Sequence, residues 1–285
     1  MSSSFLDFSF SKEDIISALK ELDPYSACPD DDVPAKVLTS CREELSIPLH
    51  ILWSNSFTTG FIPSELKSQS ITPVYKKDDR TDPANYRPVS LTSHIIKTFE
   101  RIIRDRLVNY LEDANLISCN QHGFRKKRSC LTQLLSHIEF IYRCLNNGDE
   151  VDVIYLDYSK AFDKVDHKVL LEKLKRYGIG GNVLRWIEKF LTNRSQTVQV
   201  EGVLSSSQPV VSGVPQGTVL GPILFLLYIN NLLPVLKSCK GLCFADDTKL
   251  ISRVLGKECT GRLVQSDQLV LNEQHGTPRR QVPTP

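Results

Sequence analysis

Two apolar stretches that each lead into acidic residues decide the fold of this chain. Residues 151–157 are VDVIYLD, and residues 241–254 are GLCFADDTKLISRV. The first stretch is β-branched and apolar, which is typical of a buried strand, and it ends at Asp157. The second indicates two strands, 241–245 and 248–254, joined by a tight turn at Asp246-Asp247. Together they predict a small sheet with carboxylates at one end.

Helical patterns surround these strands. Ser11, followed three residues later by Asp14, predicts the start of a helix over 11–22. Apolar residues at helical spacing predict further helices over 43–59, 94–111, 129–146, 168–177 and 182–192. Residues 71–75 resemble a strand, 197–204 a hairpin, and 213–217 a glycine- and proline-containing loop before an apolar helix. The pattern predicts an α+β fold.

The composition is that of an ordinary globular protein, with 41 % hydrophobic and 24 % charged residues. The formal net charge is only +2, so any affinity for nucleic acid must come from local clusters of basic residues. One such cluster is Lys97, Arg101, Arg104 and Arg106, and the second is residues 125–128. On charge alone, the simpler interpretation is a solvated helix face and a loop.

The eight cysteines show no metal-binding spacing. None forms a C-x-x-C pair, no histidine pair completes a zinc pattern, and several lie in apolar runs, as Cys243 does. The N-terminus has no secretory segment, and the longest apolar stretch, 219–229, is too short to span a bilayer. We expect a soluble, reduced, intracellular protein with no membrane partner, and the sequence does not distinguish nucleus from cytoplasm.

The adjacent carboxylates of Asp246 and Asp247 are costly to hold beside an apolar sheet. They repel each other unless something neutralises them. Mg²⁺ is one candidate, because it binds through one or two carboxylates together with substrate phosphates. The alternative is a plain turn, since Asp is a common turn residue. From these two residues alone, the turn is the simpler interpretation.

Five segments are more specific as an ordered set than any of them is alone. They are residues 86–91 (YRPVSL), 121–129 (QHGFRKKRS), 157–167 (DYSKAFDKVDH), 212–217 (SGVPQG) and 244–247 (FADD). In this order they resemble the motifs of reverse transcriptases of non-LTR (LINE-like) retrotransposons. The resemblance extends over about residues 11–254 and is strongest over 65–254. It favours a metal site at Asp246-Asp247 over a plain turn.

The resemblance implies a right-hand polymerase fold, with an antiparallel palm sheet backed by helices and with helical fingers. It divides the chain into a helical N-terminal extension (1–64), fingers (65–150), a palm with the catalytic motifs (151–255) and a degenerate tail (256–285). Within the palm range, residues 168–210 are partly finger and palm helices and a hairpin. The residues after Asp247 do not resemble the family's helical thumb. The expectation is therefore fingers and palm only, with the thumb absent and the tail disordered.

The resemblance also implies the residues of the site. Asp157, Asp246 and Asp247 would be catalytic and, with the backbone carbonyl of Tyr158, would hold two Mg²⁺ ions, for which Mn²⁺ can substitute. A ring at Phe162 would exclude a 2′-hydroxyl group. The nucleotide would be bound by Phe162, Gln216, Gly217, Arg87 and Arg125. The nucleic-acid backbone would be contacted by Lys97, Arg101, Arg104, Lys126, Lys127 and Arg128.

The implied function is that of an RNA-directed DNA polymerase, whose partners are an RNA template, a DNA primer and a deoxynucleoside triphosphate. The alternative is a truncated, inactive retroelement remnant that at most binds nucleic acid, because nothing would clamp the primer and template. A group II intron enzyme shares the motifs, but the N-terminal extension fits the LINE-like kind better. Cys28-Pro29-Asp30-Asp31 departs from the family's glycine-containing turn. The sequence determines neither template preference nor oligomeric state.

Overall fold

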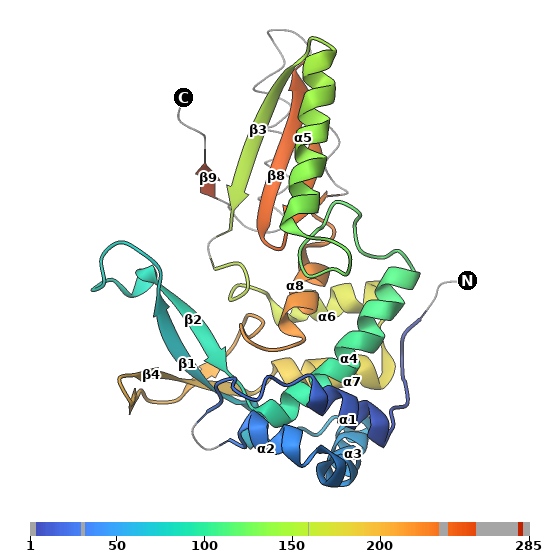
Figure 1. The fold of residues 1–285 in the computed structure, drawn as a ribbon, viewed down its shortest axis with the longest axis vertical. Coiled ribbons are helices and arrows are strands. Elements are labelled where there is room, and N and C mark those ends of the chain that lie inside the picture. The colour runs from blue at the N-terminus through green and yellow to red at the C-terminus, as the bar shows by residue number, and fades with distance from the viewer. Residues whose placement is uncertain (1–3, 30–31, 159, 234–238, 255–278, 282–285) are drawn as a thin grey trace. The chain divides into compact units, whose positions relative to one another are not determined.

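The computed structural model describes residues 4–29, 32–158, 160–233, 239–254 and 279–281 of the chain (Figure 1). The chain divides into two compact units, each made of two separated segments. Unit 1 is Met1–Ala114 with Phe162–Leu224, and unit 2 is Asn115–Ala161 with Phe225–Pro285. Each unit joins segments that are distant in the sequence, because residues 68–71 pair with residues 195–198 and residues 150–156 pair with residues 248–254.

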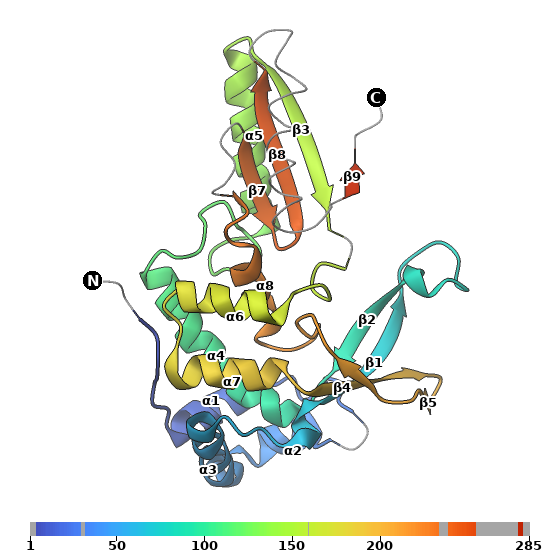
Figure 2. The same ribbon diagram turned by 180° about the vertical axis from the view of Figure 1, so that it is seen from behind.

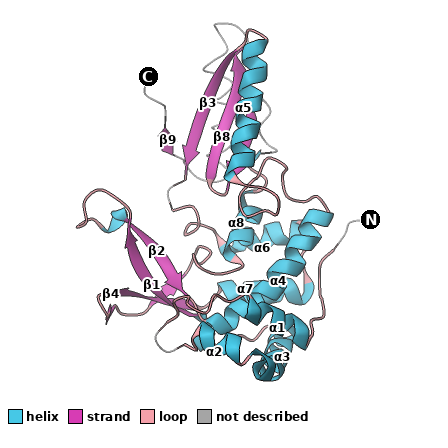
Figure 3. Cartoon of the chain, in the orientation of Figure 1, coloured by secondary structure: helices cyan, strands magenta, loops and turns pink. Residues whose placement is uncertain are grey.

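Unit 1 contains most of the helices, which are drawn in cyan in Figure 3. Its helices are α1 (Lys12–Lys20), α2 (Ala35–Ser40), α3 (Arg42–Thr59), α4 (His94–Asp113), α6 (His167–Arg176) and α7 (Gly181–Leu191). Helix α1 begins with the expected capping box, in which the Ser11 and Asp14 side chains each accept from the other's backbone amide. Helix α3 ends at Gly60, which has a φ of 78°. Local signals therefore explain these helix ends.

Aromatic packing holds the helices of unit 1 together. Trp53 of α3 stacks on Phe99 of α4 with ring centroids 5.1 Å apart, and Trp186 of α7 meets Phe99 edge-on at 5.2 Å. All three rings are fully buried. Such pairs contribute roughly 0.5–1.5 kcal/mol beyond their buried area. The apolar faces that the sequence predicts for α3, α4 and α7 therefore meet in one core.

A mixed sheet completes unit 1. Its strands are β1 (Ser68–Tyr75), β2 (Tyr86–Leu91), β4 (Arg194–Val200), β5 (Val203–Leu204) and β6 (Gln208–Val210), with short 3₁₀ helices at Ser64–Lys67 and Pro83–Asn85. Strand β1 is antiparallel to β2 and parallel to β4, and β4 also pairs with β5 and β6. The expected hairpin at 197–204 is confirmed, and Glu201-Gly202, with φ of 51° and 82°, form its turn. Residues 86–91 form a strand that the sequence does not predict.

Unit 2 is an antiparallel sheet with one long helix. The sheet has the order β7 (Lys240–Phe244), β8 (Asp247–Val254), β3 (Glu150–Asp157) and β9 (Arg279–Gln281). Helix α5 (Cys130–Asn146) packs against β3 and β7 (Figure 1 and Figure 2). The core of the sheet contains Ile154, Leu156, Leu232, Leu233, Cys243 and Leu250. The predicted antiparallel sheet is present, and the chain is a mixed α and β protein.

The hairpin that carries the acidic pair differs from expectation by one residue. Phe244 pairs with Asp247, so the turn residues are Ala245 and Asp246, and Asp247 already begins β8. Ala245 adopts a φ of 55°, a conformation that short polar residues visit more readily than alanine. The expected turn at Asp246-Asp247 is therefore wrong by one position, because neighbouring segments hold Ala245 in this conformation.

Helix α8 (Gly221–Ile229) follows the 213–217 loop, as predicted. Its first residues belong to unit 1, and its residues from Phe225 onward belong to unit 2. None of the helices in the described part of the chain combines the length and the apolar character needed to cross a bilayer. Of the expected degenerate tail, 256–285, the structure describes only residues 279–281, and the remainder lies outside the described residues.

Candidate active site

The acidic residues of unit 2 lie at one end of its sheet. Asp157 is the last residue of β3 and is exposed, and Asp247 is the exposed first residue of β8. The last β3–β8 pair is Leu156 with Thr248, so continuing the same register places Asp157 beside Asp247. Asp246 precedes Asp247 in the turn and is half-buried. Strand register alone therefore brings residues that are about 90 positions apart to one edge.

These carboxylates share an edge without forming a closed cluster. Among the residues that the structure describes, no group of three or more His, Cys, Asp or Glu side chains is arranged to hold a metal ion. The donor set is nevertheless chemically suitable, because carboxylate and main-chain carbonyl oxygens are the ligands that Mg²⁺ takes in proteins. The three aspartates and the neighbouring Tyr158 carbonyl thus fit a divalent cation by donor type.

Two titratable side chains near this edge, Tyr158 and Cys243, are uncharged. The Tyr158 side chain packs against the apolar core of the sheet, and burial raises its pKa well above the ordinary value for a phenol. Burial also raises the pKa of the fully buried Cys243 thiol to about 12. The Cys243 sulfur lies 3.2 Å from the Thr248 hydroxyl. Both groups therefore stay neutral at physiological pH and add no negative charge to that of the aspartates.

The 212–217 loop in unit 1 is hydrogen-bonded to residues 162–165 of the 157–167 motif. The Gly213 amide donates to the Val165 carbonyl at 2.8 Å, and the Val214 amide donates to the Phe162 carbonyl at 2.9 Å. The Gln216 side-chain amide donates to the Asp163 carboxylate at 3.1 Å. A Cβ on Gly213, which has a φ of 88°, would lie 2.8 Å from the Asp163 carbonyl oxygen. This approach requires glycine.

The same loop contacts strand β2 on another side. The Ser90 amide donates to the Gln216 carbonyl at 3.0 Å. A Cβ on Gly217, where φ is 105°, would lie 2.4 Å from the Ser90 carbonyl oxygen. Arg87, on the same strand, is exposed. Motifs 86–91 and 212–217 therefore meet the 162–167 part of the 157–167 motif within unit 1.

A buried carboxylate, which the sequence does not single out, anchors the end of this loop. The Glu100 side chain is fully buried, and its Oε2 accepts from the Val219 and Leu220 amides at 2.8 and 2.9 Å, at the start of α8. Burial raises the pKa of Glu100, while the two amides and the nearby Arg194 favour its ionised form. Its signal in the sequence is its position in the middle of the apolar stripe of α4, between Phe99 and Ile103.

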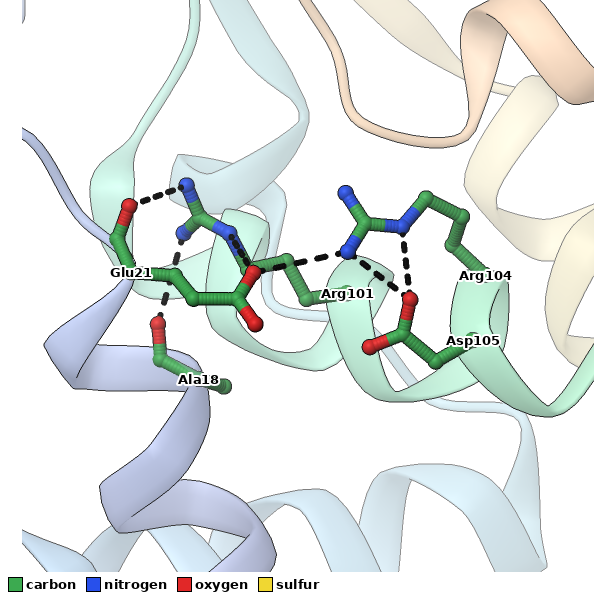
Figure 4. Close-up of polar contacts among 5 residues, drawn as sticks. All are labelled: Ala18, Glu21, Arg101, Arg104 and Asp105. Carbon is green, nitrogen blue, oxygen red and sulfur yellow. Dashed lines mark hydrogen bonds and ion pairs between the residues drawn. The ribbon is translucent and has the colours of Figure 1, made fainter. Parts of the chain in front are cut away.

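Two arginines of α4, Arg101 and Arg104, already have partners. Arg101 donates to the Ala18 and Glu21 carbonyls at 3.5 and 3.1 Å and forms an ion pair with the Glu21 carboxylate at 3.4 Å. Arg104 pairs with the same carboxylate at 3.4 Å and with Asp105 at 2.8 Å, as Figure 4 shows. Lys97 is half-buried, and burial lowers its pKa. The two guanidinium groups therefore connect α4 to the end of α1.

The second basic cluster lies in unit 2. Arg125 donates to the Ser118 carbonyl at 2.7 Å and so braces its own loop. Lys126, Lys127 and Arg128 are exposed. The structure thus places Asp157, Tyr158, Asp246, Asp247 and the basic loop in unit 2, and Phe162, Gln216, Gly217 and Arg87 in unit 1. The 157–167 motif contributes residues to both units.

The sheet with its acidic edge, the glycine-dependent loop and the order of the motifs define a class of protein. Residues 74–270 match the family described as reverse transcriptase (RNA-dependent DNA polymerase), which is more than half of the chain. The chain belongs to this family, and its relatives are polymerases of non-LTR retrotransposons, as its motifs indicate.

Among these relatives is the RNA-directed DNA polymerase from the mobile element jockey of Drosophila melanogaster. It is 33 % identical over 185 residues, which cover 65 % of this chain and 20 % of the relative. The jockey polymerase of Drosophila funebris is 26 % identical over 250 residues, which cover 85 % and 27 %. The Pol polyprotein from the type-1 retrotransposable element R2 of Popillia japonica is 27 % identical over 266 residues, which cover 93 % and 35 %. The chain therefore spans only 20 % to 35 % of the length of these relatives.

Proposed function

We propose that this chain forms the polymerising centre of an RNA-directed DNA polymerase, which adds deoxynucleotides to the 3′-hydroxyl of a DNA primer on an RNA template. The observation that supports this most directly is the acidic edge of unit 2, where strand register aligns Asp157 with Asp247 beside Asp246. Phosphoryl transfer depends mainly on positioning and on neutralising charge, rather than on covalent chemistry by the protein. An exposed edge with three carboxylates suits that requirement.

Members of the family generally use divalent metal ions. Asp157, Asp246 and Asp247, with the Tyr158 carbonyl, would hold two Mg²⁺ ions here, with Mn²⁺ able to take their place. Bound there, the ions would neutralise negative charge on the attacking and leaving oxygens of an in-line displacement. The contribution of the chain itself is to bring the carboxylates to one edge through the β3–β8 register.

The nucleotide would be held by Phe162, Gln216, Gly217, Arg87 and Arg125. The Phe162 carbonyl accepts a hydrogen bond from the Val214 amide, which fixes the backbone at this residue. From this fixed position the Phe162 ring would exclude a nucleotide that carries a 2′-hydroxyl group. Gly217 has no side chain and lets a nucleotide approach the backbone closely. The guanidinium forks of Arg87 and Arg125 suit phosphate oxygens.

The exposed Lys126, Lys127 and Arg128 are proposed to contact the nucleic-acid backbone. An RNA–DNA hybrid is recognised largely by its shape and backbone, so such contacts are salt-sensitive and tolerant of sequence. Lys97 is proposed to contribute in the same way. For Arg101 and Arg104, binding to phosphate competes with their ion pairs to Glu21, and we assign them to the packing of α4 against α1.

A second candidate function is nucleic-acid binding without polymerisation. One observation favours it: among the described residues, the three carboxylates share an edge without converging into a cluster that could hold a metal. Primer extension on an RNA template with Mg²⁺, beside an Asp246→Ala variant, distinguishes the two. Extension by the wild type that the variant lacks supports polymerisation. Equal background from both proteins, with retained binding of primer and template, would leave binding as the function.

A further inference from the structure

The residue directly before Asp246 has an unfavourable backbone conformation. Ala245 has a φ of 55°, in the left-handed region. This region is disfavoured for any residue with a Cβ, and such conformations persist only where the surrounding structure holds them. In a two-residue turn, the backbone of the first residue sets the direction of the second. The conformation of Ala245 therefore sets the position of the Asp246 backbone, from which the carboxylate extends.

A single side chain holds both polar backbone groups of Ala245. Gln121 is 4 % exposed, its Oε1 accepts from the Ala245 amide at 3.0 Å, and its Nε2 donates to the Ala245 carbonyl at 3.2 Å. Its Oε1 also accepts from the Gly123 amide at 2.9 Å. Both polar atoms of the Gln121 side chain are thus hydrogen-bonded, to the turn and to its own loop.

The backbone of this loop is fixed against the same hairpin. The Cys243 amide donates to the Asn120 carbonyl at 2.9 Å, and the His122 amide donates to the Cys243 carbonyl at 2.9 Å, which makes a parallel bridge between Gln121 and Cys243. A Cβ on Gly123 would lie 2.3 Å from the Ala245 nitrogen. Gly123 is therefore required for the loop to come so close to the turn.

We infer that Gln121 is a positioning residue for Asp246, because its amide holds Ala245 in the left-handed conformation that directs the carboxylate. This inference rests on the proposed function, in which Asp246 holds a divalent cation. The hydrogen bonds require an amide: the backbone N–H of Ala245 needs an acceptor and its carbonyl needs a donor. Leu or Met in place of Gln121 would offer neither. A residue that orients a metal ligand typically changes metal affinity roughly 10–100-fold when it is replaced.

The test measures Mn²⁺ binding to the full chain by electron paramagnetic resonance, without nucleotide or turnover. The variants are Gln121→Met, Asp246→Ala and the control Gln133→Met, with thermal unfolding measured for each. Gln133 is equally buried in unit 2, and its Oε1 accepts from the Lys249 ammonium at 3.1 Å rather than from the turn. We expect Gln121→Met to weaken Mn²⁺ binding roughly 10–100-fold, and Gln133→Met to leave it unchanged.

A second substitution separates positioning from simple anchoring of the loop. Glycine adopts a positive φ without strain, so Ala245→Gly added to Gln121→Met is expected to restore part of the Mn²⁺ affinity. Wild-type affinity in Gln121→Met, or no restoration by Ala245→Gly, would overturn the inference. Unchanged affinity in Asp246→Ala would instead overturn the proposed function. If Gln121→Met unfolds below the assay temperature, Gln121→Asn, which shortens the amide and breaks the same contacts, replaces it.

Discussion

The two units hold their functional residues by different means. In unit 2, the aspartates stand at the end of a sheet, and the pairing of β3 with β8 determines their placement. In unit 1, the 212–217 loop has no regular structure, and individual contacts from Asp163, Ser90 and Glu100 hold it and the residues that follow it. A sheet edge tolerates many residue types as long as the register holds. The loop depends on particular side chains and on the absence of a Cβ at two glycines.

The largest expected effect tests the edge of unit 2. Asp157→Asn removes one negative charge and changes little in shape. We expect primer extension to fall roughly 10³-fold or more, as it does when a charged catalytic group is removed from other enzymes, with the unfolding transition unchanged. The control is Asp152→Asn on the same strand, which pairs with Ser252 away from the edge. If Asp157→Asn extends the primer nearly as well as the wild type, the reaction does not take place at this edge.

The next effect tests the anchor in unit 1. Glu100→Ala leaves the Val219 and Leu220 amides without their acceptor in a buried place. We expect the free energy of unfolding to fall by about 2–4 kcal/mol, because two buried amides lose their acceptor and a buried donor without one costs about 1–3 kcal/mol. Chemical denaturation measures it. Asp113→Ala, at the exposed end of α4, is the control, with an expected change within about 0.5 kcal/mol. Equal effects of the two substitutions would contradict the anchor.

A smaller effect separates steric contact from backbone strain. Gly217 and Gly202 both have positive φ, of 105° and 82°, but only Gly217 has a neighbour, the Ser90 carbonyl oxygen, where a Cβ would stand. Gly202→Ala is expected to cost about 1 kcal/mol of unfolding free energy from strain alone. Gly217→Ala should cost about 1–3 kcal/mol more. Thermal or chemical unfolding of both variants checks this, and equal costs would mean that the loop can move away from β2.

The pH dependence of stability provides a further test of Glu100. Burial raises its pKa above the ordinary 4.5, so the unfolded chain loses this proton at a lower pH than the folded one. The contribution of Glu100 is therefore fully present below about pH 4.5 and is lost as the pH rises through the folded-state pKa. Glu100→Gln cannot titrate, so wild type should lose stability relative to this variant as the pH rises from 4 to 8. A pH-independent difference would contradict the assignment.

The smallest effect compares the basic residues of the two units. Lys126→Ala should reduce the slope of log affinity for a primer–template against log salt concentration by about 1. Arg101→Ala should leave that slope unchanged and lower the free energy of unfolding, because Arg101 holds the end of α1 through Ala18 and Glu21. Binding titrations at several salt concentrations measure the slopes. If Arg101→Ala reduces the slope and Lys126→Ala does not, then α4, rather than the loop in unit 2, contacts the nucleic acid.

Periodicity and local signals in the sequence predict the helices well. The expected ranges 43–59, 94–111 and 129–146 correspond to α3 (Arg42–Thr59), α4 (His94–Asp113) and α5 (Cys130–Asn146). Apolar spacing and capping are properties of neighbouring residues, so the sequence carries them without reference to the rest of the chain. Strand β2 and the one-residue shift of the acidic turn are different, because they depend on β1 and on Gln121.

The sequence by itself determined the family, the antiparallel sheet and the candidate aspartates, through five ordered motifs and the apolar strands that end in acidic residues. Only the tertiary structure showed that Glu100 anchors the start of α8, that Glu21 forms ion pairs with Arg101 and Arg104, and that Gln121 holds the turn before Asp246. Each of these contacts joins residues about 80 or more positions apart. No local pattern encodes such a contact, because its stability comes from burial and hydrogen bonds that exist only once the chain has folded.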